Sequence, residues 1–146
     1  MEPTQQTLLD ERAIEALCIR YATALDTRDW ALLATCFTPD AVAEYEGLPS
    51  SEGYDAIEKL CRDTLTPLAR SQHLLTNIHP EVAGDTATVS SYLQAQHVRP
   101  DAEGGPNFII AGRYRDQLVR TADGWRLKQR HLEIWWTEGN PAVVGG

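Results

Sequence analysis

Apolar residues recur every three or four positions through the first part of the chain, a spacing typical of helices that bury one face. The first run predicts a helix that begins at Thr7 or Asp10 and ends at Leu25 or Asp26. We expect Asp10 in its first turn, because a carboxylate suits the positive end of a helix. The buried face would carry Ile14, Leu17, Cys18, Tyr21 and Leu25.

The next segment predicts two more helices with a short strand between them. A helix from Trp30 to Cys36 follows Asp29, whose side chain can cap its first turn. Ala41 to Tyr45 is predicted to be a strand. A third helix is predicted from Tyr54 to Ala69, with Pro67 disturbing its last turn.

Alternation of apolar and polar residues takes over in the second half, a pattern typical of strands that bury one face. The turn residues Gly84-Asp85 and Ala122-Asp123-Gly124 separate these strands. We expect Asn140 to Gly146 to be a poorly ordered tail. The predicted strands are Gln72 to Glu81, Thr86 to Val98, Phe108 to Thr121 and Trp125 to Trp136.

Helices followed by antiparallel strands predict an α+β fold. A long curved sheet, mixed or antiparallel, would pack on three N-terminal helices and form a cone with a pocket inside. The chain has 146 residues, which is the size of a single domain. We expect its core to span about residues 9–136.

The composition excludes several functions. The chain has 13 basic and 21 acidic residues and a net charge of −8, which argues against nucleic acid or an anionic membrane as a partner.

The N-terminus lacks the pattern of a secretory signal, and no apolar run is long enough to span a bilayer, so we expect a cytoplasmic protein. The histidines lack metal-ligand spacing and there is no glycine-rich phosphate loop, so we expect no metal and no cofactor. The scattered cysteines Cys18, Cys36 and Cys61 are expected to be buried thiols.

Six groups of residues, in order along the chain, resemble a known family. They are Arg20 to Trp30, Cys36 to Ala41, Gly53 to Ile57, His73-Leu74 with Asn77, Gly112 to Asp116, and Gly124 to Leu127 with Arg130. This set resembles the SnoaL-like proteins of the nuclear-transport-factor-2-like superfamily, over about Leu9 to Trp136. The resemblance implies a cone-shaped α+β barrel, a fold that hosts dehydratases, cyclases, isomerases, dehydrohalogenases and non-enzymatic modules.

One branch of that superfamily includes scytalone dehydratase, the hexachlorocyclohexane dehydrochlorinases and bile-acid dehydratases. Its members have an Asp near the end of the first helix and a His on the first long strand, and Asp26 and His73 match these positions. Tyr45 and His97 lie where scytalone dehydratase has a tyrosine and a second histidine. Leu25 stands where that enzyme has another tyrosine, and we expect Tyr21, one helical turn earlier, to substitute for it.

The position of Asp26 points to the same pair on physical grounds. A carboxylate in the last turn of a helix faces the negative end of the helix dipole, at a cost of about 0.3–1 kcal/mol. A histidine is a suitable partner: the carboxylate would accept the Nδ1 proton of His73 and leave Nε2 as a general base at neutral pH. The alternative is that Asp26 caps the turn after the helix.

The remaining candidates each have a functional and a structural interpretation. Tyr45 would polarise a carbonyl, directly or through a water, or be a half-buried aromatic. His97 would donate a hydrogen bond to a substrate oxygen or aid a leaving group, or be a core residue. Asn77 shares the face of His73 by parity and would orient the substrate. Arg130 would reach an anion in the pocket, or lie on a solvated strand face.

Three hypotheses of function result. The first is a cofactor-independent lyase of the dehydratase type, acting on a small hydrophobic cyclic molecule of polyketide, steroid or aromatic character. The second is a polyketide-type cyclase or an isomerase that uses the same pair. The third is a non-catalytic binding or assembly subunit. The resemblance also implies a homodimer or homotrimer formed through the outer sheet face, with the contact residues Tyr92, Gln94, Gln96, Trp135 and Trp136.

Overall fold

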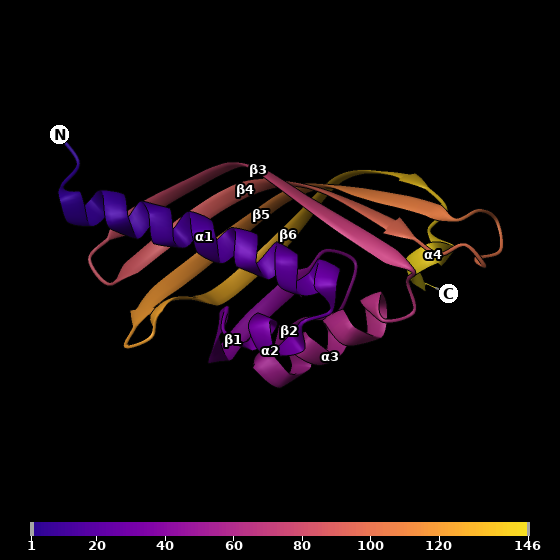
Figure 1. The fold of residues 1–146 in the computed structure, drawn as a ribbon, viewed down its shortest axis with the longest axis horizontal. Helices are drawn as coiled ribbons and strands as arrows, with labels where there is room; N and C mark the ends of the chain where they lie inside the picture. Colours follow the sequence, from indigo (N-terminus) through magenta and orange to yellow (C-terminus); the bar gives the residue numbers. More distant parts are fainter. Residues whose placement is uncertain (1, 146) are drawn as a thin grey trace.

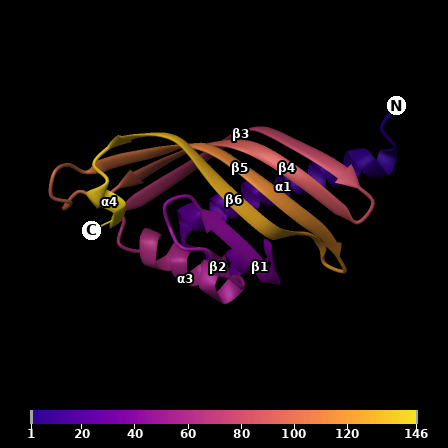
Figure 2. The same ribbon diagram turned by 180° about the vertical axis from the view of Figure 1, so that it is seen from behind.

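The computed structural model describes residues 2–145 and has the predicted α+β architecture. A curved, open sheet of six strands arches over the helices α1, α2 and α3 (Figure 1). Seen from behind, the strands β3 to β6 cover α1 and leave their outer face free of helices (Figure 2). The elements are α1 (Gln5–Thr27), α2 (Trp30–Ala34), β1 (Phe37–Tyr45), β2 (Ser51–Glu52), α3 (Tyr54–Leu65), β3 (Arg70–Ala83), β4 (Thr86–Val98), β5 (Asn107–Thr121), β6 (Gly124–Gly139) and α4 (Ala142–Gly145).

The sheet is mixed, with the strand order β2-β1-β6-β5-β4-β3. Only β1 and β6 run parallel, and every other neighbouring pair is antiparallel. Register shifts place an extra residue in β3 after Thr76 and an extra residue, Trp135, in β6 opposite Gly112 of β5. A Cβ at Gly112 would overlap the carbonyl oxygen of Glu133, so this close approach of two strands requires glycine. Such irregularities bend a sheet, and the bend provides the concave face on which the helices pack.

The strand β4 follows its predicted bounds, and its odd positions from Ala87 to His97 face the core. On the outer face, large apolar side chains remain exposed, and the ring of Tyr92 packs edge-on against Trp135 at 5.2 Å between centroids. The exposed apolar residues of this face are Leu74, Tyr92, Trp135 and Trp136. The association of copies of the chain through this face stays a prediction.

Among residues 2–145, no helix is long and apolar enough to cross a membrane.

Several boundaries differ from the prediction for identifiable reasons. The helix α3 ends at Leu65 rather than Ala69: Thr66 still has helical dihedral angles, but Pro67 has no backbone N–H with which to continue the helical hydrogen bonds. The strand β1 begins at Phe37 rather than Ala41, since Phe37 already pairs with Leu127 of β6.

The C-terminal segment also differs from the prediction of a poorly ordered tail. Asn140 accepts a hydrogen bond from the backbone N–H of Ala142 (3.1 Å) and donates to the carbonyls of Glu103 (2.9 Å) and Gly105 (2.8 Å). The short helix α4 then buries Val143 in the core. Gly146 lies outside the described residues.

The expected role of Asp10 in the first turn of α1 is wrong. The helix begins earlier, at Gln5, and the hydroxyl of Thr4 caps it by accepting from the N–H of Thr7 (3.0 Å). Asp10 is buried instead, and it accepts hydrogen bonds from Arg120 of β5 (2.7 and 2.9 Å) and from the indole of Trp125 (3.1 Å). The bonds from Arg120 hold the pKa of Asp10 well below its usual value.

A second buried ion pair supports the centre of the sheet. Arg130 of β6 is fully buried and donates two hydrogen bonds to the carboxylate of Asp116 of β5, at 2.9 and 2.8 Å. Its guanidinium carbon also lies 4.1 Å from the ring centroid of Tyr21 and 3.8 Å from that of Tyr114. The cation therefore joins two strands of the sheet to the inner face of α1.

We expect the substitution Arg130→Met to lower the free energy of unfolding by about 3–5 kcal/mol, because it leaves Asp116 as an unpaired buried charge. The double variant Arg130→Met, Asp116→Leu should recover part of this loss, since it buries no charge at all. Urea unfolding of the two variants measures the difference. A loss below about 1 kcal/mol for Arg130→Met, the size of an exposed pair, would contradict the buried arrangement.

Candidate active site

Asp26 ties the C-terminal end of α1 to the start of β3. Its Oδ1 accepts hydrogen bonds from Nδ1 of His73 (2.7 Å) and from the hydroxyl of Ser71 (3.0 Å). Its Oδ2 accepts from the backbone N–H of His73 (2.8 Å). The predicted pair is therefore brought together. These three bonds offset the unfavourable position of a carboxylate at the negative end of the helix.

The end of α1 is itself fixed by Arg28. This residue adopts a left-handed backbone conformation (φ 56°). Its backbone N–H donates hydrogen bonds to the carbonyl oxygens of Ala24 and Leu25, and these bonds end the helix. The Arg28 guanidinium also donates to the carbonyl of Leu25 (2.6 Å) and to the hydroxyl of Ser71 (2.8 Å). The Ser71 hydroxyl must then donate its own proton to Asp26, which orients the carboxylate further.

These contacts determine the protonation of the pair. Burial favours the neutral acid in Asp26, but the hydrogen bonds from His73 and Ser71 outweigh it, and the pKa of Asp26 is lowered overall. An ionised carboxylate only accepts hydrogen bonds, so Nδ1 of His73 carries a proton, and in the neutral ring Nε2 carries a lone pair. Among residues 2–145, no group hydrogen-bonds this Nε2.

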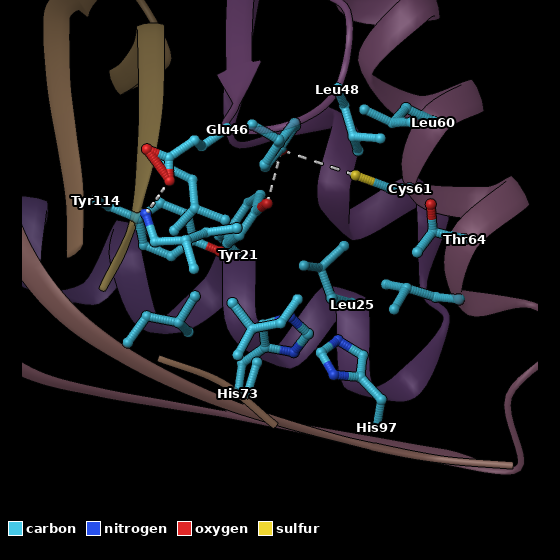
Figure 3. Close-up of a pocket in the computed structure, with 17 residues that line it drawn as sticks. Tyr21, Leu25, Glu46, Leu48, Leu60, Cys61, Thr64, His73, His97 and Tyr114 are labelled. Carbon is cyan, nitrogen blue, oxygen red and sulfur yellow. Dashed lines mark hydrogen bonds between the residues drawn. The ribbon is translucent and has the colours of Figure 1, made fainter. Parts of the chain in front are cut away.

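His73 faces an open-mouthed cavity of about 120 Å³ that is lined by the concave side of the sheet, α1 and α3 (Figure 3). The walls are mostly apolar, and Leu48 and Glu46 of the loop after β1 stand at its rim. Asp26 is not among the lining residues, so it acts on the cavity only through His73. The apolar lining includes Leu25, Leu60, Leu65, Leu93, Ala95, Ile110, Leu132 and Ile134.

Two tyrosines meet at another wall of this cavity. The hydroxyls of Tyr21 and Tyr45 are 2.8 Å apart, and that of Tyr45 also lies 3.9 Å from the thiol of Cys61. Burial raises the pKa of both phenols well above the usual value, so both keep their protons. The two hydroxyls share one hydrogen bond between them, so one O–H of the pair is left to donate either to the weak acceptor Cys61 or to a ligand oxygen. Tyr21 and Tyr45 are thus neighbours in the cavity, and their role in binding a substrate stays a prediction.

His97 also lines the cavity, from the strand next to His73. Its ring lies edge-on to that of His73, with 6.0 Å between centroids, and its Nδ1 is 3.2 Å from the carbonyl oxygen of Phe108. Burial, followed by the proximity of His73, lowers the pKa of His97 to about 4. His97 is therefore neutral at neutral pH, with its proton on Nδ1, and its Nε2 accepts rather than donates a hydrogen bond. The expectation of a donor to substrate is wrong for this tautomer.

Two predicted residues lie outside the cavity. Asn77 follows the register shift after Thr76 and has a positive φ of 49°. The extra residue at this shift breaks the alternation of faces along β3, so Asn77 is exposed and does not lie on the face of His73. Arg130 lies beneath the rings of Tyr21 and Tyr114, paired with Asp116, and does not line the cavity. It supports the tyrosine wall instead of binding an anion.

Other residues of the site were missed from the sequence. Ser71 could have been found, because it shares the parity of His73 on β3. Glu46 gave no such signal, since its position depends on a bond from the backbone N–H of Ile134 to its carboxylate (3.0 Å). Burial raises the pKa of the Cys61 thiol to about 11, so this thiol is a poor nucleophile. In the part of the chain that the structure describes, no three His, Cys, Asp or Glu side chains gather as metal ligands would.

The neutral state of His97 predicts a pH dependence of stability. Between its usual pKa of 6.5 and its folded value of about 4, the unfolded chain binds a proton that the folded chain does not. The contribution is therefore full above pH 6.5 and falls with decreasing pH, by up to about 1.4 kcal/mol per unit. Urea unfolding between pH 7 and pH 4 should show a shallower decline for His97→Gln than for the wild type. Equal slopes would contradict a buried neutral His97.

Comparison with known proteins agrees with this fold. An uncharacterised protein of Mycobacterium tuberculosis, Rv2910c, is 33% identical over 123 residues, which are 83% of this chain and 82% of the relative. A structure from Novosphingobium aromaticivorans, provisionally assigned as an aromatic ring hydroxylase, is 27% identical with a TM-score of 0.85 and covers 99% of each chain.

A second structure from Novosphingobium aromaticivorans is provisionally assigned as a scytalone dehydratase. It is 30% identical, with a TM-score of 0.82, over 91% of this chain and 89% of that one. The sequence model of the SnoaL-like domain matches residues 6–131, most of the chain. The chain therefore belongs to the SnoaL-like domain family, and its fold is nuclear-transport-factor-2-like.

Proposed function

We propose that this protein is a cofactor-independent lyase of the dehydratase type, in which His73, oriented by Asp26, removes a proton next to a carbonyl group. The observation that carries the proposal is the lone pair on Nε2 of His73, which has no protein partner in residues 2–145 and faces an apolar cavity. The similarity to a structure provisionally assigned as a scytalone dehydratase supports the same chemistry.

The reaction begins when Nε2 of His73 takes a proton from the carbon beside the carbonyl. The C–H electron pair forms a carbon–carbon double bond, and the leaving group departs from the neighbouring carbon with its bonding electrons. Asp26 stabilises the imidazolium that forms, through the hydrogen bond that it accepts from Nδ1. The imidazolium then returns its proton to the departing group, so His73 ends the cycle neutral.

The tyrosine pair supplies the other half of the chemistry. As the proton leaves, negative charge develops on the carbonyl oxygen, and a fixed donor aimed at that oxygen lowers the barrier. The free O–H of the Tyr21–Tyr45 pair is such a donor, and Arg130 beneath the ring of Tyr21 holds it in place. We propose that Tyr21 and Tyr45 bind the substrate carbonyl.

A cyclisation or a double-bond isomerisation begins with the same proton transfer and is the second candidate. The product distinguishes them: a dehydration removes the mass of one water, whereas an isomerisation leaves the mass unchanged. Small cyclic ketones fit the apolar lining, so cyclohexanone tests proton transfer and β-hydroxycyclohexanone tests elimination.

We expect the wild-type protein to exchange the α-protons of cyclohexanone in deuterium oxide, measured by NMR. His73→Ala and Asp26→Asn should slow this exchange about a thousandfold or more, because one lacks the base and the other has the wrong tautomer. Asp26→Asn should also lower the free energy of unfolding by about 1–3 kcal/mol, since a neutral amide loses the charge-assisted hydrogen bonds that the carboxylate accepts from His73 and Ser71.

His131→Ala is the matched control, because His131 is exposed outside the cavity. It should keep wild-type exchange. Circular dichroism melting shows whether each variant is folded at the assay temperature. If the folded wild type exchanges no α-proton, the proposal fails and a binding or assembly module is the better description.

A further inference from the structure

We propose that Ser71 and Arg28 are positioning residues that set the pH range in which His73 can act as a base. Their hydrogen bonds withdraw negative charge from the carboxylate of Asp26, so the imidazolium of His73 is stabilised less than it would be beside an unrestrained carboxylate. The neutral ring therefore persists to lower pH. This inference rests on the proposed function, because it concerns the control of the base that the proposed reaction uses.

The first observation is that the hydrogen bonds around Asp26 have fixed directions. A guanidinium only donates, so the hydroxyl oxygen of Ser71 accepts from Nη1 of Arg28 (2.8 Å). The ionised carboxylate of Asp26 only accepts, so the Ser71 hydroxyl donates its proton to Oδ1 (3.0 Å). A hydroxyl that accepts a hydrogen bond from a cation becomes a stronger donor. Arg28 therefore strengthens the bond from Ser71 to Asp26.

The second observation is that Ser71 and His73 share one oxygen of the carboxylate. Oδ1 accepts from the Ser71 hydroxyl and from Nδ1 of His73 (2.7 Å), whereas Oδ2 accepts from the backbone N–H of His73. Burial raises the pKa of Asp26, but the bonds from His73 and, with a smaller effect, from Ser71 lower it overall. A charge that Ser71 already stabilises at Oδ1 gains less from an imidazolium at the same oxygen. The bond from Ser71 therefore opposes the protonation of His73.

The third observation is that this control lies outside the cavity. Arg28 and Asp26 line a separate surface groove of about 970 Å³, and neither Ser71 nor Arg28 lines the cavity. The positive charge of Arg28 nevertheless reaches the concave face, because it adds to burial and to His73 in lowering the pKa of His97. The same charge disfavours a second positive charge on His73, so it acts in the same direction as the hydrogen bond from Ser71.

The other ionisable groups around the dyad leave this control in place. His97 is neutral at neutral pH, and the phenols of Tyr21 and Tyr45 keep their protons, because burial lowers the pKa of the imidazole and raises that of the phenols. Within residues 2–145, the side chains that donate to the carboxylate of Asp26 are those of His73 and Ser71. The remaining ionisable groups nearby are Glu46, Cys61 and Tyr114 at the cavity and Arg62, Asp63 and Arg70 in the groove.

Proton NMR of the ligand-free protein tests the inference, by following the Cε1–H signal of His73 through its titration. Ser71→Ala removes the donor and should move the titration midpoint to higher pH by about 0.5–1 unit, the size of one neutral hydrogen bond. Arg28→Met should move the midpoint in the same direction. Ser71→Thr keeps the hydroxyl and should restore the wild-type midpoint.

Arg70→Met is the matched control, because it removes a positive charge from the same groove but no hydrogen bond to Ser71 or Asp26. It should move the midpoint by less than about 0.3 unit, since an exposed charge is screened. The direction of the shift separates charge control from mere support: a loosened dyad would weaken the bond between Asp26 and His73 and lower the midpoint. Ser71→Ala and Arg28→Met break different links, so one decides the question where the other does not fold.

A midpoint that stays or falls in either folded variant would overturn the inference. The titration needs no turnover, so its outcome is separate from that of the proposed function. If the wild type exchanges no α-proton of cyclohexanone while the midpoints rise as expected, the proposed function fails and the control of His73 stands. If exchange occurs and the midpoints do not rise, this inference alone fails.

Discussion

The carboxylate of Asp26 is the interaction on which the rest of the site depends. It sits where a helix least favours a negative charge, and three hydrogen bonds from β3 compensate for that position. Because one of these bonds comes from a backbone N–H, the carboxylate fixes the strand itself as well as the ring of His73. The helix, the strand and the tautomer of the base are therefore set by one group. Loss of that group would disturb all three together.

The cavity beside this pair is apolar, yet the structure places a full positive charge directly behind its tyrosine wall. Arg130 is tolerated there because Asp116 neutralises it and the faces of two tyrosine rings cover it. The charge thus acts as a rigid support for phenol groups and does not reach a ligand. An apolar residue at this position would pack as well but would not fix the angle of Tyr21 through its π face.

Much of this arrangement could be predicted from local patterns. The alternation along β4 placed His97 on the inner face, and helical spacing placed Tyr21 on the buried side of α1. The failures have a common origin in contacts between distant segments. The bulge after Thr76 turned Asn77 outward, and the partner of Arg130 lies on another strand. The tautomer of His97 depends on a carbonyl of β5, which no local pattern reveals.

The position of Asp26 outside the cavity, next to solvent, has a consequence for how this scaffold can evolve. The side chain of Asp26 is 21% exposed and lies outside the cavity, whereas that of His73 is 7% exposed and faces into it. The strength of the base and the shape of the cavity are therefore encoded by different residues. Substitutions around Ser71 and Arg28 would change the strength of the base without changing the shape of the cavity. Reactivity and substrate choice can then diverge independently among proteins that share this scaffold.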